Sequence, residues 1–315
     1  MELLELVKAA FIGIVEGITE WLPISSTGHM ILFNEFVHLN VSEAFWNMFL
    51  VVIQLGAILA VCVIYFKKLN PFASSKSYEE RRSTWNLWGK IVVGCVPAAI
   101  VGLAFDDFME EHFYNAYVVA AALIVYGIAF IVIERWRAQH IKTNILSQSV
   151  SRPRGAHFAS SLNQGTNNDQ GFDVCDSDFG EISSVEDMSY KTALGIGCFQ
   201  VLSLVPGTSR SGSTIIGGLL LGTTRSCAAE YTFFLAIPVM FGASLLKLVK
   251  FIVKGGTITT MELAIMLVGM LVAFVVSLAA IKWLIGFVRK HDFQPFGVYR
   301  IILGMAVLIY FMFLV

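Results

Sequence analysis

The stretch EGITEWLPISSTGH, residues 16–29, interrupts an apolar N-terminal region with two acids, a proline and a run of hydroxyls. A counterpart, VPGTSRSG at residues 205–212, interrupts a second apolar region and carries an arginine near its centre. Because proline and clustered small polar residues end helices, neither region, 3–39 or 191–221, is expected to be one continuous helix. We expect two broken or re-entrant segments, since such backbone is tolerated at membrane depth only inside protein or beside a wet cavity.

Six further segments are long and apolar enough to cross a bilayer, which takes about 20 mostly apolar residues. They cover residues 45–66, 87–105, 116–133, 230–253, 261–285 and 298–315. Charged residues make up only 14% of the 315 residues and hydrophobic ones 56%, whereas soluble domains have about 25% charged residues. The sequence therefore predicts an all-α integral membrane protein with six transmembrane helices and two re-entrant, broken helical segments.

The chain divides into two halves of similar plan, each a broken segment followed by three spans. Residues 23–28 resemble residues 206–212 in their proline, hydroxyls and glycine. With three spans in each half, the second half must be inserted upside down, and such inverted-topology repeats place a site near the midplane where the repeats meet. We therefore expect a first membrane repeat at 1–137 and a second, inverted repeat at 191–315.

Residues 138–190 separate the two repeats and differ from them in composition. They are rich in Ser, Asn, Asp and Gly, with an acidic end. Low hydrophobicity with clustered charge favours an unfolded chain. The sequence predicts a polar, largely disordered cytoplasmic linker here, whose acids are better explained as solvated charge than as a catalytic site.

Lys and Arg set the expected orientation, because they accumulate in cytoplasmic loops. They concentrate at the junctions after the first, third and fifth spans, so that side is predicted to be cytoplasmic and the C-terminus lies outside. Three lysines contradict this pattern: Lys247, Lys250 and Lys254 approach the outer end of the fourth span. The net charge of −1 provides no global field for nucleic acid, and none is expected as a partner.

Glu16 and Glu20 are four residues apart, so on a helix they share one face with about 5–6 Å between their Cβ atoms. Two such carboxylates can hold a hard divalent cation, Mg²⁺ or Ca²⁺, or one of them can stay protonated beside the other. The bland alternative is an interfacial turn whose acids reach water. The hydroxyls and the imidazole that follow at 25–29 favour a functional site instead.

Arg210 lies in the second broken segment, among hydroxyls and after a Pro-Gly pair. A helix that begins there would direct its free N–H groups at an anion, and the planar guanidinium suits phosphate. Small residues for close helix packing are the competing explanation, but packing does not require an arginine. Carboxylates, hydroxyls, an imidazole and an arginine together suit phosphoryl transfer, which depends on positioning and charge neutralisation.

Several motifs extend the argument to a known family. EGITEWLPISSTGH at 16–29, VIQLGAILAV at 52–61, VPGTSRSG at 205–212 and AAEYTFFLAIP at 228–238 resemble the undecaprenyl-pyrophosphate phosphatases of bacteria, of the bacitracin-resistance type. The likeness continues in YRIILG at 299–304 and covers nearly the whole chain outside the linker. The linker is longer than expected of the family, and its role is left open.

The resemblance implies hydrolysis of undecaprenyl pyrophosphate to undecaprenyl phosphate and inorganic phosphate, which recycles the lipid carrier of cell-wall synthesis and confers bacitracin resistance. It also implies a Mg²⁺ or Ca²⁺ requirement and a multi-pass protein of the bacterial cytoplasmic membrane. The site would open to the extracytoplasmic side. A polyprenyl-phosphate transporter or flippase is the alternative, because inverted repeats with broken helices are also transporter architecture.

The resemblance also assigns roles to residues. The implied catalytic residues are Ser26, His29, Glu20 and Arg210. The implied substrate phosphate-binding residues are Ser25, Thr27, Thr208, Ser209 and Ser211, and the implied metal ligands are Glu16 and Glu20. Ser26 is the candidate nucleophile, with His29 or a glutamate as its acid–base partner. The expected partners are the polyprenyl pyrophosphate lipid and the bilayer, and a homodimer is left open.

Overall fold

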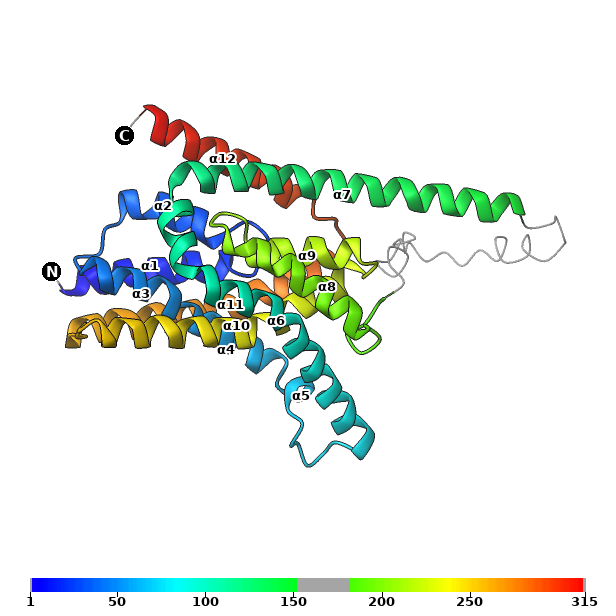
Figure 1. Cartoon of the computed structure of the whole chain (residues 1–315), viewed down its shortest axis with the longest axis horizontal. Coiled ribbons are helices and arrows are strands. Elements are labelled where there is room, and N and C mark those ends of the chain that lie inside the picture. Colours follow the sequence, from blue (N-terminus) through cyan, green and yellow to red (C-terminus); the bar gives the residue numbers. More distant parts are fainter. Residues whose placement is uncertain (1, 152–181, 314–315) are drawn as a thin grey trace, which may run out of the picture.

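The computed structural model describes residues 2–151 and 182–313, which form helices joined by short connections (Figure 1). In chain order the elements are α1 (Glu2–Thr19), α2 (Ser26–Phe36), α3 (Glu43–Val52), α4 (Gln54–Ile64), α5 (Phe66–Leu69), α6 (Tyr78–Phe113), α7 (Ala116–Ser151), α8 (Tyr190–Val201), the 3-10 turn η2 (Leu202–Leu204), α9 (Arg210–Leu220), α10 (Arg225–Val253), α11 (Thr260–Val288) and α12 (Gln294–Phe313). Within the described ranges no strand is present, and the all-α prediction is confirmed.

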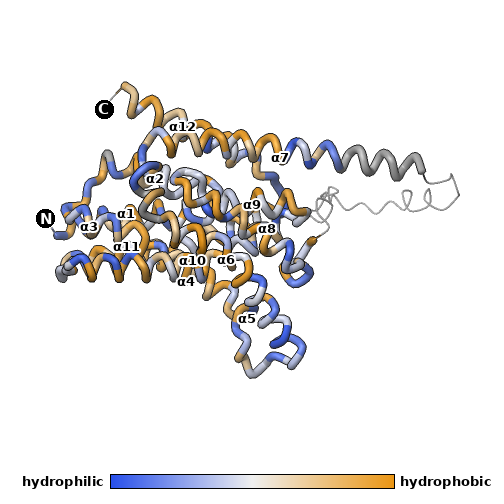
Figure 2. Tube along the Cα trace, viewed as in Figure 1, coloured by the Kyte–Doolittle hydropathy of each residue, from blue (hydrophilic) through white to orange (hydrophobic). Residues whose placement is uncertain are grey.

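Six helical stretches are long and apolar enough to cross a membrane, which confirms the predicted number of spans. They are Glu43–Ile64, Tyr78–Phe105, Ala116–His140, Arg225–Val253, Thr260–Val288 and Gln294–Phe313. Hydrophobic residues predominate along these helices (Figure 2). On α11, for example, Leu263, Leu267 and Leu271 recur every fourth residue and are exposed. A continuous exposed stripe of leucine suits lipid rather than water. The chain is a multi-pass membrane protein.

The two polar motifs interrupt helices, as their composition predicts. Residues 20–25 separate α1 from α2, and residues 202–209 separate α8 from α9. Proline alone does not decide the break, because Pro97 and Pro238 lie inside α6 and α10, which continue past them. The depth to which the broken segments enter the bilayer stays a prediction.

The packing relates the two halves of the chain by an exchange of partners. The first helix of each half packs against the second span of the other half, α1 on α11 and α8 on α6, while the third spans α7 and α12 pack on each other. Matching glycines allow both close approaches: a Cβ on Gly13 would collide with the carbonyl oxygen of Gly269, and a Cβ on Gly197 would collide with that of Gly94. This reciprocal pattern is what two related halves produce when they interlock.

The segment between the halves departs from the expected linker at both ends. α7 continues as helix to Ser151, beyond the expected boundary at residue 137. After the undescribed residues 152–181, Ile182 pairs with Thr223, and Val185 and Met188 are buried. The predicted disorder of residues 152–181 lies outside the described residues, and the division into domains stays a prediction.

α1 begins and α12 ends at one end of the molecule, opposite the end where α7 stops (Figure 1).

Candidate active site

Ser25 and Ser209 build the site by starting the two helices that follow the breaks. Each precedes a helix as its N-cap: the Ser25 hydroxyl accepts a hydrogen bond from the Gly28 N–H, and the Ser209 hydroxyl accepts one from the Gly212 N–H. Serine is a preferred N-cap because its oxygen satisfies one of the free N–H groups of the first turn. Two helix N-termini, with their partial positive charge, therefore begin within the two polar motifs.

The two motifs contact each other directly, although about 190 residues separate them in sequence. The Ser211 hydroxyl lies 3.2 Å from the carbonyl oxygens of both Glu20 and Leu22. It is also 3.1 Å from the Ser209 hydroxyl. Hydrogen bonds to the backbone of the opposite motif hold the two breaks together, so Ser211 joins the breaks to each other as well as being a predicted phosphate contact.

Glu20 is at the centre of the site, between a hydroxyl and a guanidinium. One carboxylate oxygen, Oε1, accepts a hydrogen bond of 3.2 Å from Arg210 Nη2, and the other, Oε2, accepts one of 2.9 Å from the Ser26 hydroxyl. The Glu20 and Arg210 side chains are only 8% and 10% exposed. The structure thus brings together three of the four predicted catalytic residues around one carboxylate.

Arg210 is held by two further groups. Its Nη1 donates to the Thr232 carbonyl on α10 at 2.9 Å, and its guanidinium lies 6.0 Å from the ring centre of Trp21. Its Nε is buried and has no hydrogen-bond partner within the described part of the chain. A buried guanidinium with an N–H group left over is suited to an anionic ligand, because guanidinium donors bind phosphate oxygens.

Glu16 lies one turn before Glu20 on α1 and is 1% exposed. Its Oε1 has no hydrogen-bond partner among the described residues. An unpartnered buried carboxylate oxygen is costly unless something else neutralises it. The structure therefore brings together both acids of the predicted metal pair and leaves one of their oxygens available.

His29 does not point its ring nitrogens at Ser26. Nδ1 lies 2.7 Å from the Ser25 carbonyl oxygen, and Nε2 lies 2.7 Å from the Tyr299 hydroxyl of α12. The two rings are also stacked, with centres 5.6 Å apart. Of the two acid–base partners left open for Ser26, the geometry favours Glu20, and it places His29 in a contact between α2 and α12.

Arg300 is the site residue that the motif analysis missed. It lies on α12, is fully buried, and its guanidinium donates to the carbonyl oxygens of Pro23, Gly207 and Thr208. One side chain thereby binds both breaks. An arginine inside an apolar span was the available signal, because such charges are expensive and mark functional positions.

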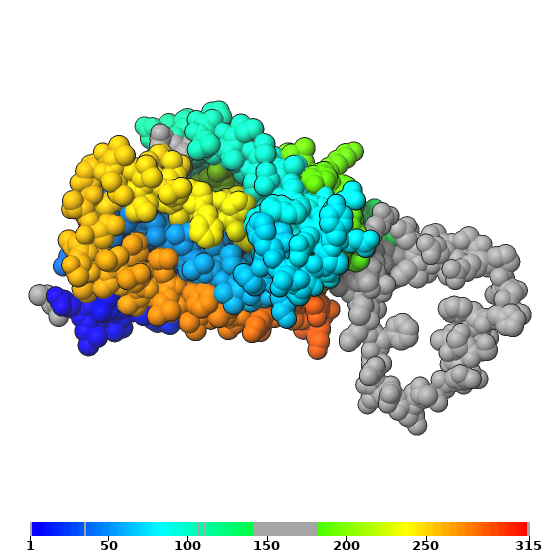
Figure 3. Space-filling model, turned by 90° about the horizontal axis from the view of Figure 1, so that it is seen from below, coloured from blue at the N-terminus to red at the C-terminus, as the bar shows by residue number. Residues whose placement is uncertain are grey.

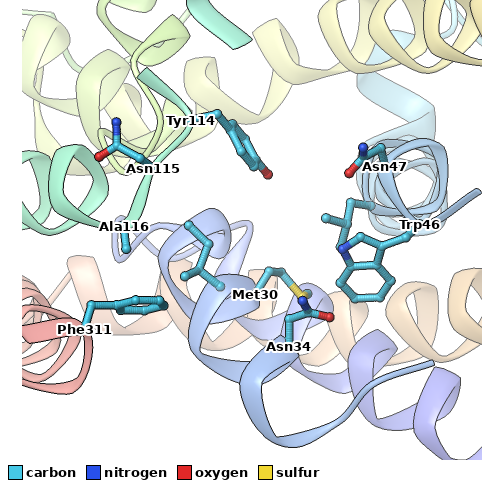
Figure 4. Close-up of a pocket in the computed structure, with 10 residues that line it drawn as sticks. Met30, Asn34, Trp46, Asn47, Tyr114, Asn115, Ala116 and Phe311 are labelled. Atoms are coloured by element: carbon cyan, nitrogen blue, oxygen red, sulfur yellow. The ribbon is translucent and has the colours of Figure 1, made fainter. Parts of the chain in front are cut away.

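The remaining predicted phosphate-binding residues divide between the interior and the cavity surface. Ser25 and Thr208 are each 1% exposed, whereas Thr27 lines a cavity of about 640 Å³ together with Ser203 and Pro206 of the second break. A smaller neighbouring cavity of about 260 Å³ is lined by Asn34, Asn47 and Tyr114 among others (Figure 4). Asn34, Asn47 and Tyr114 line both cavities, so the two adjoin. The larger cavity therefore reaches both breaks, at Thr27 of the first and at Pro206 of the second, and we call it the entrance cavity.

These features define a class of protein: a multi-pass helical membrane protein with a carboxylate–arginine–serine site enclosed between two broken helices. The chain belongs to the family described as bacitracin resistance protein BacA, whose model matches residues 9–306. It is 53% identical to the undecaprenyl-diphosphatase of Streptococcus mutans, over 97% of this chain and 96% of that protein. The corresponding protein of Enterococcus faecalis is 49% identical over 97% of both chains.

A third relative, the undecaprenyl-diphosphatase of Streptococcus thermophilus, is 52% identical over 98% of this chain and 94% of its own length. The family match runs from residue 9 to residue 306, so it includes both broken segments, the first five spans and most of the sixth. The resemblance inferred from the motifs is confirmed.

Proposed function

We propose that this protein is an undecaprenyl-diphosphatase, which hydrolyses undecaprenyl diphosphate to undecaprenyl phosphate and inorganic phosphate. The relatives named for this activity are about half identical over nearly the full length. The observation that carries the proposal is the position of Glu20, hydrogen-bonded to the Ser26 hydroxyl and to Arg210 where the two breaks meet. A transporter with the same fold is not favoured by the relatives' names.

Ser26 is the nucleophile in this proposal, and Glu20 is its base. The Ser26 oxygen attacks the terminal phosphorus while its proton passes to Glu20 Oε2, 2.9 Å away, a distance suited to general-base catalysis. The bond from the terminal phosphorus to the bridging oxygen breaks, and undecaprenyl phosphate leaves with the electron pair. Water then attacks the phosphoserine, the P–Oγ bond breaks, and Ser26 recovers a proton as phosphate departs.

Arg210 stabilises the charge on the phosphoryl oxygens during both displacements. Its partly free guanidinium and the N-terminal N–H groups of α2 and α9 are fixed before the substrate arrives. Preorganised donors in a site with little water stabilise a transition state more than solvent does. The enclosure of Glu20 and Arg210 supports this role.

Glu16 and Glu20 would hold the Mg²⁺ or Ca²⁺ ion that the family resemblance implies. The unpartnered Glu16 Oε1 fits this purpose. Within the described ranges, no cluster of three or more His, Cys, Asp or Glu side chains could cage an ion alone. That agrees with Mg²⁺, which keeps several waters and is completed by substrate phosphates. When bound, such an ion neutralises phosphate charge.

The proposed location is the bacterial cytoplasmic membrane, with the site open to the extracytoplasmic side. The entrance cavity supports this orientation, because it is lined by Glu43 at the start of α3, Met109 near the end of α6 and Lys247 near the end of α10. These ends of α3, α6 and α10 lie away from the end of the molecule where α7 stops (Figure 1). The homodimer considered from the sequence stays a prediction.

Phosphate release from undecaprenyl diphosphate by the purified protein in detergent tests the proposal. We expect one inorganic phosphate and one undecaprenyl phosphate per turnover, loss of turnover in EDTA, and recovery when Mg²⁺ or Ca²⁺ is restored. Glu79→Gln, an exposed acid at the start of α6, serves as a control and is expected to match the wild type. A pure, folded protein that binds the lipid but releases no phosphate would contradict the proposal and favour transport.

A further inference from the structure

Three lysines lie on one face at the end of α10. Lys247, Lys250 and Lys254 are three and four residues apart, the spacing that places side chains on one side of a helix. This part of α10 packs against α3, where the Ser244 hydroxyl donates to the Val51 carbonyl at 3.0 Å. Lys247 and Lys250 are half-buried. We call these three residues the lysine face.

The lysine face opens into the entrance of the site. Lys247 lines the 640 Å³ cavity, and so do Thr27 of the first break and Pro206 of the second. A second cavity of about 470 Å³ is lined by all three lysines. Glu43, Asn47 and Lys247 line both cavities, so the two are continuous. A continuous space, lined by both polar and apolar groups, therefore runs from the lysine face to the broken helices.

The space-filling view shows the same opening from outside. A hollow lies between the end of α10 and the end of α6, and the green segment that follows the linker is visible at its floor (Figure 3). Met109 of α6, Lys247 of α10 and Leu204 before the second break line this cavity. Lys247 of the lysine face and the residues that begin the second break therefore line the same cavity.

The charge on the lysine face is unusual for a membrane protein. The Lys and Arg residues of the other loops predict that this end of the molecule is extracytoplasmic. Lysine is disfavoured on that side of a membrane protein. Among the residues lining the 470 Å³ cavity, the charged ones are the three lysines and Glu43, so positive charge predominates. A half-buried lysine also bears a desolvation cost. A function in the site explains these three lysines better than the orientation of the protein in the membrane does.

We propose that the lysine face is a phosphate-binding vestibule that receives the diphosphate group before it reaches Arg210 and holds inorganic phosphate as it leaves. The inference rests on the proposed phosphatase function. Clefts lined by one sign of charge concentrate oppositely charged ligands and steer them inward. Lysine suits this passing role, because its ammonium binds phosphate as a point charge without the two-pronged grip of arginine.

The test compares Lys247→Gln and the triple variant K247Q/K250Q/K254Q with the wild type, as full-length proteins in an uncharged detergent. Lys282→Gln is the matched control, since Lys282 is an exposed lysine near the C-terminal end of α11 and lies outside the lysine face. Three quantities are measured: KM and kcat for undecaprenyl diphosphate, the inhibition constant of inorganic phosphate, and the affinity for inorganic pyrophosphate by calorimetry. The calorimetric measurement reports on the vestibule without turnover.

We expect KM to rise about two- to fivefold in Lys247→Gln and about tenfold in the triple variant, with kcat retained. Phosphate inhibition and pyrophosphate affinity weaken in parallel, and Lys247→Arg restores them because the charge returns. High salt brings the wild type and the variants together, since screening shortens the reach of charge. A change in KM alone identifies capture of the lipid headgroup, and a change in phosphate inhibition alone identifies product exit; each supports the vestibule.

Wild-type KM, phosphate inhibition and pyrophosphate affinity in the triple variant would overturn the inference. An effect that occurs only in vesicles of anionic lipid would overturn it too, because the lysines would then bind the bilayer. A fall in kcat without a change in KM would assign them to folding or to the chemical step. If the wild type binds pyrophosphate through the lysines yet releases no phosphate, the phosphatase proposal fails and the vestibule stands.

Discussion

Ser25 and Ser209 adopt the same strained backbone conformation, with φ of 70° and 71°, and each caps the helix that follows it. They are the non-glycine residues of positive φ in the described part of the chain. Their separation in sequence equals that of Gly13 and Gly197, which make equivalent packing contacts. The two breaks are therefore the same structural device used twice, and each strained turn begins a helix inside the site.

Replacing Ser209 distinguishes the cap from the strain. Ser209→Ala keeps the Cβ in the unfavourable conformation and removes the cap, at a cost of about 1 kcal/mol. Ser209→Gly also removes the cap, but it relieves strain of about 1 kcal/mol or more. We expect alanine to lower the thermal unfolding midpoint in detergent and glycine to leave it nearly unchanged. Equal losses for the two variants would show that the backbone conformation costs little.

Arg210 is expected to require its planar fork. Arg210→Lys keeps the charge but cannot bind both Glu20 and the Thr232 carbonyl while it contacts phosphate, so turnover should fall at least about tenfold. Arg210→Ala should lose about 10³-fold. The measurement is kcat for phosphate release, with Arg289→Lys, an exposed arginine just after α11, as the control. Wild-type turnover by Arg210→Lys would show that Arg210 does not bind phosphate through its planar guanidinium.

Glu16 and Glu20 should differ in the consequences of amide substitution. Glu20→Gln removes the proposed base of Ser26 and the charge beside Arg210, so kcat should fall by about 10²-fold or more. Glu16→Gln removes the second carboxylate of the proposed metal pair, whose Oε1 has no partner among the described residues, so the main effect should be a higher Mg²⁺ concentration for half-maximal activity. Unaltered Mg²⁺ dependence in Glu16→Gln would remove Glu16 from the proposed metal site.

His29 should matter less than Glu20 for the chemical step. Its ring nitrogens bind the Ser25 carbonyl and the Tyr299 hydroxyl, so its role is to hold α2 against α12. We expect His29→Gln and Tyr299→Phe to reduce kcat by similar, moderate factors and to leave the pH profile of kcat unchanged. If His29→Gln removes a limb of that profile while Tyr299→Phe does not, His29 is the acid–base partner of Ser26.

Arg300 should be essential to the arrangement of the two breaks. Arg300→Met leaves the carbonyl oxygens of Pro23, Gly207 and Thr208 without their buried donor, and each such loss costs about 1–3 kcal/mol. A lower thermal midpoint and a lower kcat are both expected. Arg300→Lys should recover only part of either, because one ammonium cannot match the geometry of the fork. A methionine variant with normal stability and turnover would contradict this role.

Local composition was sufficient to predict the spans and the breaks. Long apolar runs have few alternatives to helices in a bilayer, because every backbone polar group must be satisfied internally. The breaks at residues 20–25 and 202–209 also follow from local chemistry, namely proline, glycine and serine in short succession. The types of residue in the site could also be predicted from the sequence, because charged residues are rare in apolar segments and mark functional positions there.

The sequence by itself therefore determined the all-helical membrane class, the two breaks and the candidate residues Glu16, Glu20, Ser26 and Arg210. Only the tertiary structure decided their partners: Glu20 rather than His29 lies beside Ser26, and Arg300 joins the breaks from α12. A hydrogen bond depends on distances of tenths of an ångström and on direction. Those are set by how α1, α9 and α12 pack, and residues about 190 to 280 positions apart carry no local signal of that packing.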